Sequence, residues 1–556
     1  MHDTHHLDVR LREEAHRGNQ LEWHLSKKDM DVFDLNLILI LTAAAFMAGS
    51  QFLFHGSGSL VMAFFSQLPY IPVLLVLLIF TAAPIGVYIG SKSEDYRDVF
   101  LVNVVFIALL LVLAMYGQIV AGPQLLRIPH ILFFGLNFRV DRLTFLLVVA
   151  ATVIWLLAMV FGHRYIKAEE KNRSRFYSAM IITYGCVMGG MMANDLFTMF
   201  LFFEIMYLSC YFIVSHSQTE EALSAGNRYI YMGIVGGLSM FLGICLIYAY
   251  TRTLMISDIR MGLEAAWAGN TLILTVAIIS FLIGFIIKAA IFPLHFWLPN
   301  AHASAPSPAS AVLSGMVIKV YIFSIMKFLF IVVGMDLFIA MGLLGIFAPL
   351  AVVGMIMGSV FAIGQTELKK MLAYSTVAQV GYMLLGIGLM SRMGLAASMF
   401  HIITHALMKS ALFLSAGAIL YQTGKKKISD FNGLGYQMPV TMGVFTVGAL
   451  SMIGIPGFNG FMSKWYLGMA ALEAGKPVFV LMILVSSFLN AMYYLPIVIA
   501  AFLKEDPAKE TRVSLDQIPL NMMAPLVLLA AGCILFGLFP QLVMGFIQSA
   551  IASFYL

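Results

Sequence analysis

The stretch KAAIFPLHFWLPNAHASAPSPASAVLSGMVIK, residues 288–319, decides the fold of this chain. It carries one lysine, Lys288, in a long apolar run shortly before a proline, Pro293, and a second, Lys319, deep inside the next apolar run. A charged side chain at the centre of a bilayer costs roughly 2.5–3.5 kcal/mol on the insertion scale, so such residues usually serve the movement of ions or protons. The stretch therefore predicts membrane helices that carry functional charges.

The composition of the whole chain is typical of a polytopic membrane protein. Of its 556 residues, 61% are hydrophobic and 11% are charged, whereas a soluble domain has about 25% charged residues. Apolar runs long enough to span roughly 30 Å of hydrocarbon recur along the chain. The net charge of +5 forms no basic patch, so it indicates loop residues that set topology and excludes nucleic-acid binding. The polar N-terminus predicts no cleavable signal peptide.

We predict an all-α fold with about fifteen transmembrane helices, preceded by a charged, soluble arm over residues 1–32. Two segments are interrupted, one at Pro293 and one at the IPGFNG sequence that contains Pro456. Interrupted helices in corresponding places of two halves indicate an inverted-repeat transporter. The apolar segments lie near residues 35–55, 71–91, 99–120, 143–163, 176–193, 197–215, 229–252, 271–303, 306–331, 335–361, 371–391, 395–421, 440–473, 478–503 and 523–548.

The loop charges predict the topology. With the N-terminus inside, the inner segments carry 21 lysines and arginines and the outer segments carry 8. This excess favours a cytoplasmic N-terminus in a plasma (inner) membrane, with an odd number of spans.

Four lysines and one carboxylate lie inside apolar helices: Lys288, Lys319, Lys409, Lys464 and Glu204. A lysine has an ordinary pKa near 10.4, and desolvation lowers this by about 3–5 units, which brings it toward neutrality. A carboxylate at an assumed ~7 Å, with an effective dielectric of ~20, would stabilise the ammonium by roughly 2.4 kcal/mol. Movement of Glu204 relative to a lysine would therefore switch the release of a proton.

The alternative for a membrane lysine is snorkelling, in which the ammonium reaches the interface. This interpretation suits Lys327. For Lys409 it is one alternative, and a functional role is the other. His401, His405 and Lys409 share one helical stripe. For the histidines we prefer a proton relay, with buried structural hydrogen bonding as the alternative; a metal site lacks further ligands. His295 and His302 are either part of the path or bond backbone groups freed at the break.

The sequence predicts no cofactor in this chain. The four cysteines stand singly in apolar segments, without a CxxC spacing for zinc or an iron–sulfur cluster. No Rossmann or P-loop glycine pattern occurs. Redox cofactors, if the protein takes part in redox chemistry, would belong to its partners.

Four motifs in order resemble the antiporter-like subunits of the complex I and Mrp antiporter superfamily: KAAIFPLHFWLPNAHASAPSPASAVLSG, LKKMLAYSTVAQVGYMLLGIGL, FHIITHALMKSALFLSAGAI and ALSMIGIPGFNGFMSKWYL. The resemblance covers about residues 70–550 and is greatest to the Mrp D subunit and to subunits of membrane-bound hydrogenases. It implies a fourteen-helix core with two inverted five-helix repeats, plus one extra N-terminal helix. The implied ranges are an extra helix and loop (33–70), peripheral helices (71–175), two repeats that each form a half-channel (176–331 and 335–503), and a loop with a C-terminal helix (504–556).

The resemblance also implies roles for the buried charges. Glu204 matches the family's gating glutamate, Lys288 and Lys464 match the lysines of the two broken helices, and Lys319 matches a central lysine. His401, His405 and Lys409 match a stripe between them. Asn300 replaces an aspartate common after FWLP in the family. The implied function is proton translocation, alone or in exchange for Na⁺, through a chain of Lys, Glu and His.

The functional setting stays open between three alternatives. The chain would serve a redox-driven pump such as an NADH-quinone oxidoreductase or a hydrogenase, an Mrp-type cation/proton antiporter, or an inorganic carbon uptake complex. The expected partners are other membrane subunits, with cytoplasmic iron–sulfur subunits or a zinc-containing protein according to the setting. No bond-making active site is visible in the chain, so an enzymatic activity would belong to the assembled complex. A scaffold that no longer conducts would have lost these lysines, so this class is disfavoured.

Overall fold

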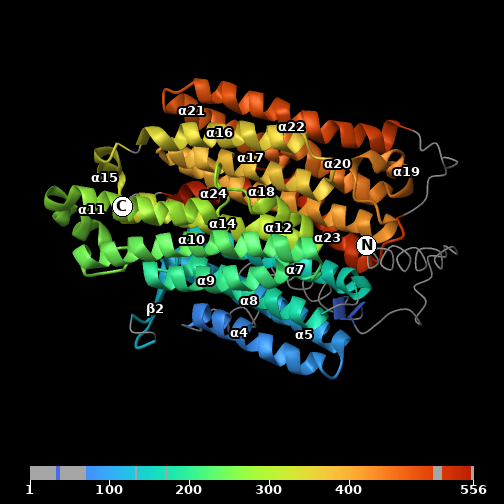
Figure 1. Ribbon diagram of the computed structural model, residues 1–556, viewed down its shortest axis with the longest axis horizontal. Coiled ribbons are helices and arrows are strands. Elements are labelled where there is room, and N and C mark those ends of the chain that lie inside the picture. The colour runs from blue at the N-terminus through green and yellow to red at the C-terminus, as the bar shows by residue number, and fades with distance from the viewer. Residues whose placement is uncertain are drawn as a thin grey trace.

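The fold is a bundle of long helices that run along one common axis, as Figure 1 shows. The computed structural model describes residues 33–34, 36–37, 70–131, 134–169, 172–342, 344–504 and 516–551. In these ranges the one β-structure besides isolated bridges is an antiparallel hairpin of β1 (Gln124–Ile128) and β2 (Leu136–Val140). The predicted all-α class is confirmed.

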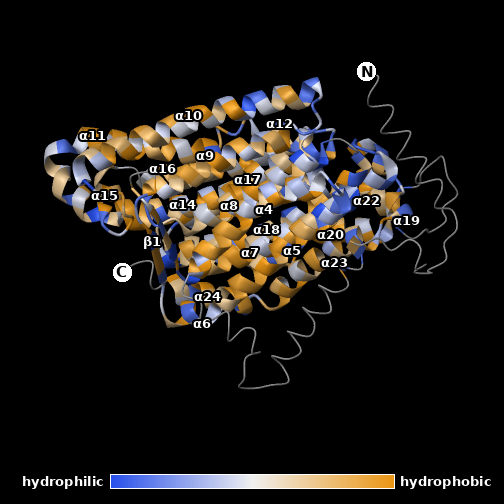
Figure 2. Cartoon of the chain, turned by 90° about the horizontal axis from the view of Figure 1, so that it is seen from below, coloured by the Kyte–Doolittle hydropathy of each residue, from blue (hydrophilic) through white to orange (hydrophobic). Residues whose placement is uncertain are grey.

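Twelve helices in the described ranges are long and apolar enough to cross a membrane. Hydrophobic residues line the shafts of the helices and hydrophilic ones gather toward the two ends of the bundle (Figure 2). Each predicted apolar segment from residue 71 onward overlaps a helix. Of the twelve, two are composite: α5 (Glu94–Ala114) continued to Ala121, and the segment Ser307–Val333. The other ten are single helices: α4 (Ile71–Gly90), α7 (Arg142–Glu169), α9 (Leu196–Val214), α10 (Glu220–Thr251), α11 (Ile259–Lys288), α16 (Leu344–Ile363), α17 (Leu368–Gly388), α18 (Arg392–Thr423), α22 (Val478–Leu503) and α23 (Leu520–Leu538). A further long helix outside this set is α8 (Arg173–Met192).

Shorter elements complete the bundle. The segment expected at 523–548 as one helix is two, because the chain breaks between α23 and α24 beside Pro540. The segment at 306–331 contains two π-helical turns, η1 and η2. The shorter elements are α6 (Tyr116–Ala121), α12 (Leu298–Ser304), α13 (Ser307–Val312), η1 (Leu313–Val317), α14 (Ile318–Lys327), η2 (Phe328–Val333), α15 (Met335–Ala340), η3 (Ile428–Phe431), α19 (Leu434–Gln437), α20 (Pro439–Ile453), α21 (Asn459–Glu473) and α24 (Gln541–Ile551).

Both predicted helix breaks are present. The first separates α11, which ends at Lys288, from α12, which begins at Leu298, and Pro293 lies between them. The second separates α20 from α21, with Pro456 between two glycines, Gly454 and Gly457, that have φ of 91° and 93°. Proline removes a backbone donor and glycine adopts positive φ without strain, so both sequences end a helix locally.

The two ends of the bundle differ in their loops. At one end, which we call the basic end, the loop before α17 lies against the loop of Lys425–Lys427. Glu367 and Lys427 form an isolated β-bridge between these two loops. At the opposite end, the β1–β2 hairpin bridges Ala193, after α8, through Phe138. The hairpin and α19 mark these two ends in Figure 1.

The predicted arm at 1–32 and almost all of the helix at 35–55 lie outside the described residues, so the total of about fifteen helices stays a prediction. Residues 33 and 34 are described, and they touch the end of α7. The ring of Phe33 stacks on His163 with centroids 3.9 Å apart, and Asp34 pairs with Arg164 at 3.1 Å.

The most buried helices lie at the centre of the bundle. Segment 307–333, α17 and α18 each have 94% of their most apolar window buried inside the chain. All of the sequence-predicted lysines except Lys288 and Lys464 lie on these three elements. Their charges are therefore enclosed by protein, not by lipid.

Candidate functional site

Glu204 and Lys288 form an ion pair inside the membrane region. Glu204 lies in α9 and Lys288 is the last residue of α11, and Oε1 and Nζ are 3.0 Å apart. The assumed separation of ~7 Å is therefore wrong, and the pair is in direct contact. Lys288 is fully buried, whereas the Glu204 side chain is 35% exposed on the surface of this chain. Gly237 of α10 leaves room for the carboxylate, because a Cβ there would lie 2.7 Å from Oε1.

Aromatic residues hold Lys288 at the helix break. Its Nζ lies 4.3 Å from the centre of the Tyr207 ring, at a distance at which the ring face attracts a cation. The indole of Trp297, beyond the break, donates to the Ile287 carbonyl at 2.8 Å and so ties the two sides of the break together. Tyr207 had no signal in its own sequence, since an aromatic residue in a membrane helix is ordinary.

Lys319 lies at the start of α14, fully buried. Its Nζ donates to the Ser314 carbonyl, which the π-helical turn η1 places near it. The Ser314 hydroxyl bonds the Thr376 hydroxyl of α17 at 2.8 Å. Within the described part of the chain no ion pair reaches Lys319, and its hydrogen bond runs to a neutral carbonyl.

The predicted stripe on α18 is buried along its whole length. His401 and His405 stack with ring centroids 5.9 Å apart, and His401 Nδ1 lies 2.9 Å from the Ser463 hydroxyl of α21. Lys409 is fully buried and donates to the Leu372 carbonyl at 2.6 Å and to the Ser375 hydroxyl, so the snorkelling interpretation of Lys409 is wrong. Both ring nitrogens of His405 and Nε2 of His401 lack a partner among the described residues.

Lys464 lies in α21, five residues after its start. Its Nζ donates to the carbonyls of Met452 and Ile453 at 2.9 and 2.7 Å, which the break after α20 leaves free, and to the Ser487 hydroxyl at 2.9 Å. It also lies 5.0 Å from the centre of the Tyr382 ring of α17.

The snorkelling interpretation is also wrong for Lys327. This side chain is 4% exposed, and its Nζ donates to the carbonyls of Met191 and Ala193 at 2.6 and 3.3 Å. Apolar flanks on both sides do not distinguish a helix that faces lipid from one that faces protein.

The two alternatives remain open for His295 but not for His302. His302 is buried, and both of its ring nitrogens lack a partner in the described residues, as does Nδ1 of His295. The His302 ring stacks on Phe413 with centroids 5.0 Å apart. His302 therefore does not bond the backbone freed at the break in the way that one alternative requires.

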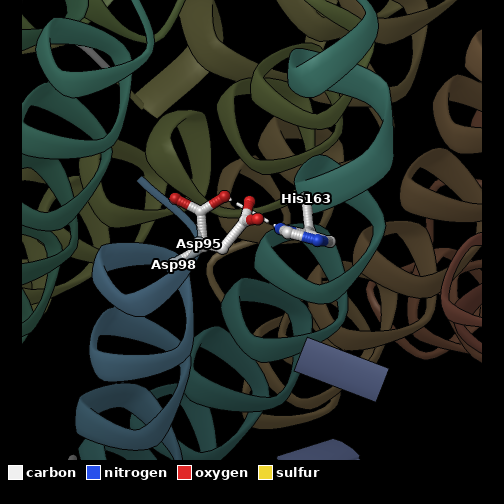
Figure 3. A group of neighbouring side chains, drawn as sticks. All are labelled: Asp95, Asp98 and His163. Atoms are coloured by element: carbon white, nitrogen blue, oxygen red, sulfur yellow. Dashed lines mark hydrogen bonds and ion pairs between the residues drawn. The ribbon is translucent and has the colours of Figure 1, made fainter. Parts of the chain in front are cut away.

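A second group of charges, which sequence reasoning missed, lies at the basic end. Asp95, Asp98 and His163 place carboxylate oxygens and a ring nitrogen within 4.8 Å of one another, as Figure 3 shows. Two guanidinium groups already bind the Asp98 carboxylate. Arg97 donates to Oδ1 from Nε at 2.9 Å and from Nη2 at 2.7 Å, and Arg173 donates to Oδ2 at 2.9 Å. A carboxylate saturated by cations is a poor metal ligand, so this group is a buried ionic connection between α5, α7 and α8.

The chain is similar in sequence and in structure to known proteins. Residues 193–490 match the family described as NADH:quinone oxidoreductase/Mrp antiporter, transmembrane. The NADH-quinone oxidoreductase N subunit of Desulforudis audaxviator is 33% identical over 75% of this chain and 85% of its own length. The Na⁺/H⁺ antiporter D subunit of Alkalihalophilus pseudofirmus is 29% identical over 73% and 80%. A chain of the Mrp complex of Dietzia sp. superposes with a TM-score of 0.78 and 25% identity, covering 88% of this chain and 98% of that one.

Proposed function

Because the chain belongs to the NADH:quinone oxidoreductase/Mrp antiporter transmembrane family, we propose that it is the proton-translocating, antiporter-like subunit of a multisubunit membrane complex. The observation that supports this most directly is a row of buried basic groups with one carboxylate at its Lys288 end. Such groups are costly inside a bilayer and rarely serve structure alone. The row consists of Glu204, Lys288, Lys319, Lys409, His405, His401 and Lys464.

The geometry supports a stepwise path. Glu204 holds a proton on Lys288 while the pair is closed, and its movement away from Lys288 weakens that hold. The proton passes by way of Lys319 to the histidine pair on α18, and from there to Lys464. His401 adjoins Lys464 through Tyr382, whose ring stacks with the imidazole at 5.5 Å between centroids. A neutral imidazole accepts and donates through its two nitrogens, which suits a relay.

Partner subunits follow from the exposure of Glu204. A carboxylate that is 35% exposed beside a membrane helix would meet hydrocarbon unless protein covers it. We propose that a neighbouring membrane subunit covers this face. The excess of basic loops at one end supports a multi-pass chain in a plasma (inner) membrane with a cytoplasmic N-terminus.

Of the three candidate settings, two are represented among the relatives, which include an oxidoreductase subunit and a Na⁺/H⁺ antiporter subunit. In the first, partners carry redox cofactors and drive proton movement. In the second, cation exchange drives it. Both assign no cofactor to this chain, whose cysteines show no cluster spacing. Purification of the tagged chain with its partners, followed by mass spectrometry, separates them: iron–sulfur subunits indicate the first, and small membrane subunits alone the second. A large zinc-containing partner would indicate carbon uptake.

A transport assay tests the path itself. The complex is reconstituted in proteoliposomes, and proton uptake under an imposed potential is followed with a pH-sensitive dye. Lys288→Ala should abolish most of the transport and Glu204→Ala should alter its rate and pH dependence, whereas Lys426→Ala, which changes an exposed lysine of the basic end, should do neither. Intact transport in both of the first two variants would contradict the proposal.

A further inference from the structure

Two of the buried lysines lie over tyrosine rings in the same manner. Lys288 Nζ is 4.3 Å from the centre of the Tyr207 ring, and Lys464 Nζ is 5.0 Å from the centre of the Tyr382 ring. Both lysines adjoin a helix break, and both tyrosines belong to unbroken helices, α9 and α17. The face of an aromatic ring attracts an ammonium and has little affinity for a neutral amine. Each ring therefore favours the charged form of its lysine.

The residue three positions before each tyrosine differs between the two places. In α9 the sequence is EIMY, from Glu204 to Tyr207, and in α17 it is QVGY, from Gln379 to Tyr382. Residues three apart share one face of a helix. In α9, both members of this pair contact the same lysine, since Glu204 also pairs with Lys288. In α17 the corresponding residue is an uncharged amide.

Gln379 is an unusual residue for the centre of a packed helix. It is fully buried, and neither Oε1 nor Nε2 has a partner among the described residues. An unpartnered buried amide is less favourable than an apolar side chain of the same size. Packing alone would therefore be better served by methionine, so the amide requires an explanation other than packing.

The face of α17 that carries Gln379 contacts the buried bases one after another along the helix. Its residues at positions 375, 376, 379 and 382 follow the spacing of a single stripe. Gln379 stands between the contact to the Lys319 region and the contact to Lys464. The contacts are Ser375 with Lys409, Thr376 with Ser314, and Tyr382 with Lys464.

We propose that Tyr382 and Gln379 are positioning residues of a second lysine seat, built like that of Lys288 but with a neutral amide in place of the carboxylate. The ring of Tyr382 holds the ammonium of Lys464, and Gln379 provides a dipole without a counter-charge. Because a carboxylate stabilises a neighbouring ammonium more than an amide does, Lys464 gives up its proton more readily than Lys288. This inference rests on the function proposed above, and it makes Lys464 the releasing end of the path.

The other groups around Lys464 are consistent with this assignment. No carboxylate pairs with it within the ranges that the structure describes, and its hydrogen bonds run to two carbonyls and a hydroxyl. The helices packed against α21 contribute bases and neutral acids of high ordinary pKa. The buried titratable groups on these helices are Tyr382 of α17, His401, His405 and Lys409 of α18, Tyr493 and Tyr494 of α22, and Cys533 of α23, and the central Lys319 of α14 lies beyond them.

The first test introduces the missing carboxylate. Gln379→Glu is made in the full chain, purified with its partner subunits, and proton transport in proteoliposomes is measured over a pH series. An opposite charge one helical turn from the ring would retain the proton on Lys464, so the pH of half-maximal transport should rise by about 1–2 units. Gln379→Asn, which keeps the amide, should retain the wild-type profile. An unchanged profile in Gln379→Glu would overturn the inference.

The second test adds no charge, so it stands if Gln379→Glu fails to assemble. Tyr382→Phe keeps the ring face and should leave the pH profile unchanged. Tyr382→Leu removes the ring and should lower the pH of half-maximal transport by about 1 unit. Equal pH profiles in Tyr382→Phe and Tyr382→Leu would contradict the proposal that the Tyr382 ring holds the Lys464 ammonium, because a packing role alone would not depend on the ring in this way.

Lys464→Ala distinguishes failure of this inference from failure of the proposed function. If that variant transports protons at the wild-type rate, Lys464 is not on the path and the proposed function fails in its second half. If Lys464 is required, and the Gln379 and Tyr382 variants keep the wild-type pH of half-maximal transport, only the role proposed for Tyr382 and Gln379 at Lys464 is wrong.

Discussion

Replacement of Glu204 by glutamine removes one charge and keeps the volume of the side chain, and it tests the gate directly. At 3.0 Å, the pair with Lys288 has a Coulomb energy of about 5.5 kcal/mol at an effective dielectric of ~20. The Glu204 side chain is 35% exposed, so screening reduces this to about 2–3 kcal/mol. One pH unit corresponds to about 1.36 kcal/mol. Glu204→Gln should therefore lower the pH of half-maximal transport by about 2 units.

The assay is the initial rate of proton uptake by proteoliposomes that contain the assembled complex, over a pH series at fixed membrane potential. The matched control is Glu264→Gln, which removes the same charge from an exposed pair with Arg260 at 2.8 Å. An exposed pair contributes at most about 1 kcal/mol, and this one lies outside the row, so the pH profile should not move. An unchanged or alkaline-shifted profile in Glu204→Gln would refute the reasoning, since the lost charge can only weaken the hold on the proton.

Three further perturbations follow from the structure. Gly237→Ala places a Cβ 2.7 Å from the Glu204 carboxylate, so transport should fall by up to about 100-fold, whereas Gly443→Ala, with open space around it, should have no effect. Asp98→Asn leaves two guanidinium groups without their buried partner, so the complex should lose about 3–5 kcal/mol of stability in thermal unfolding. Burial beside the Arg175 guanidinium lowers the pKa of His216 to about 4. The contribution of His216 to the free energy of unfolding is therefore complete above its ordinary pKa near 6.5, and about 3 kcal/mol of it is lost as the pH falls to 4. Melting curves of His216→Gln, recorded over this pH range, should lack this pH-dependent loss of stability.

The sequence predicted the helices because each had to span the hydrocarbon. An apolar run of the required length has few alternatives in a membrane chain. The breaks were predictable for an equally local reason, since Pro293 and Pro456 cannot continue a helix. The split between α23 and α24 was missed because Pro540 falls within an otherwise continuous apolar run.

The contacts of the buried charges could not be predicted in the same way. A lysine with apolar flanks is compatible with lipid or with protein on either side, and only tertiary packing shows that Lys327 and Lys409 are enclosed. The distance between Glu204 and Lys288 depends on how α9 packs against the end of α11, which no spacing along the chain reveals. The ionic group around Asp98 was hidden for a further reason. Asp95 and Asp98 lie near the start of α5, where charged residues are ordinarily solvated, and their partners His163 and Arg173 come from α7 and α8, far along the chain.

The position of the carboxylate constrains where control of the path can lie. Lys319 and Lys464 are held by carbonyls and hydroxyls, whose dipoles do not change with pH or with the protonation of a partner. Lys288 alone in the row faces a group of opposite charge, and that group borders the surface of the chain, where a neighbouring subunit can move it or neutralise it. A change of a few ångströms at Glu204 alters the free energy of the Lys288 proton by about 2–3 kcal/mol, whereas the same displacement of a neutral dipole alters it far less. On the proposed path, we therefore expect coupling to a driving subunit to act at the Glu204 end, and the remaining sites to conduct the protons which that end releases.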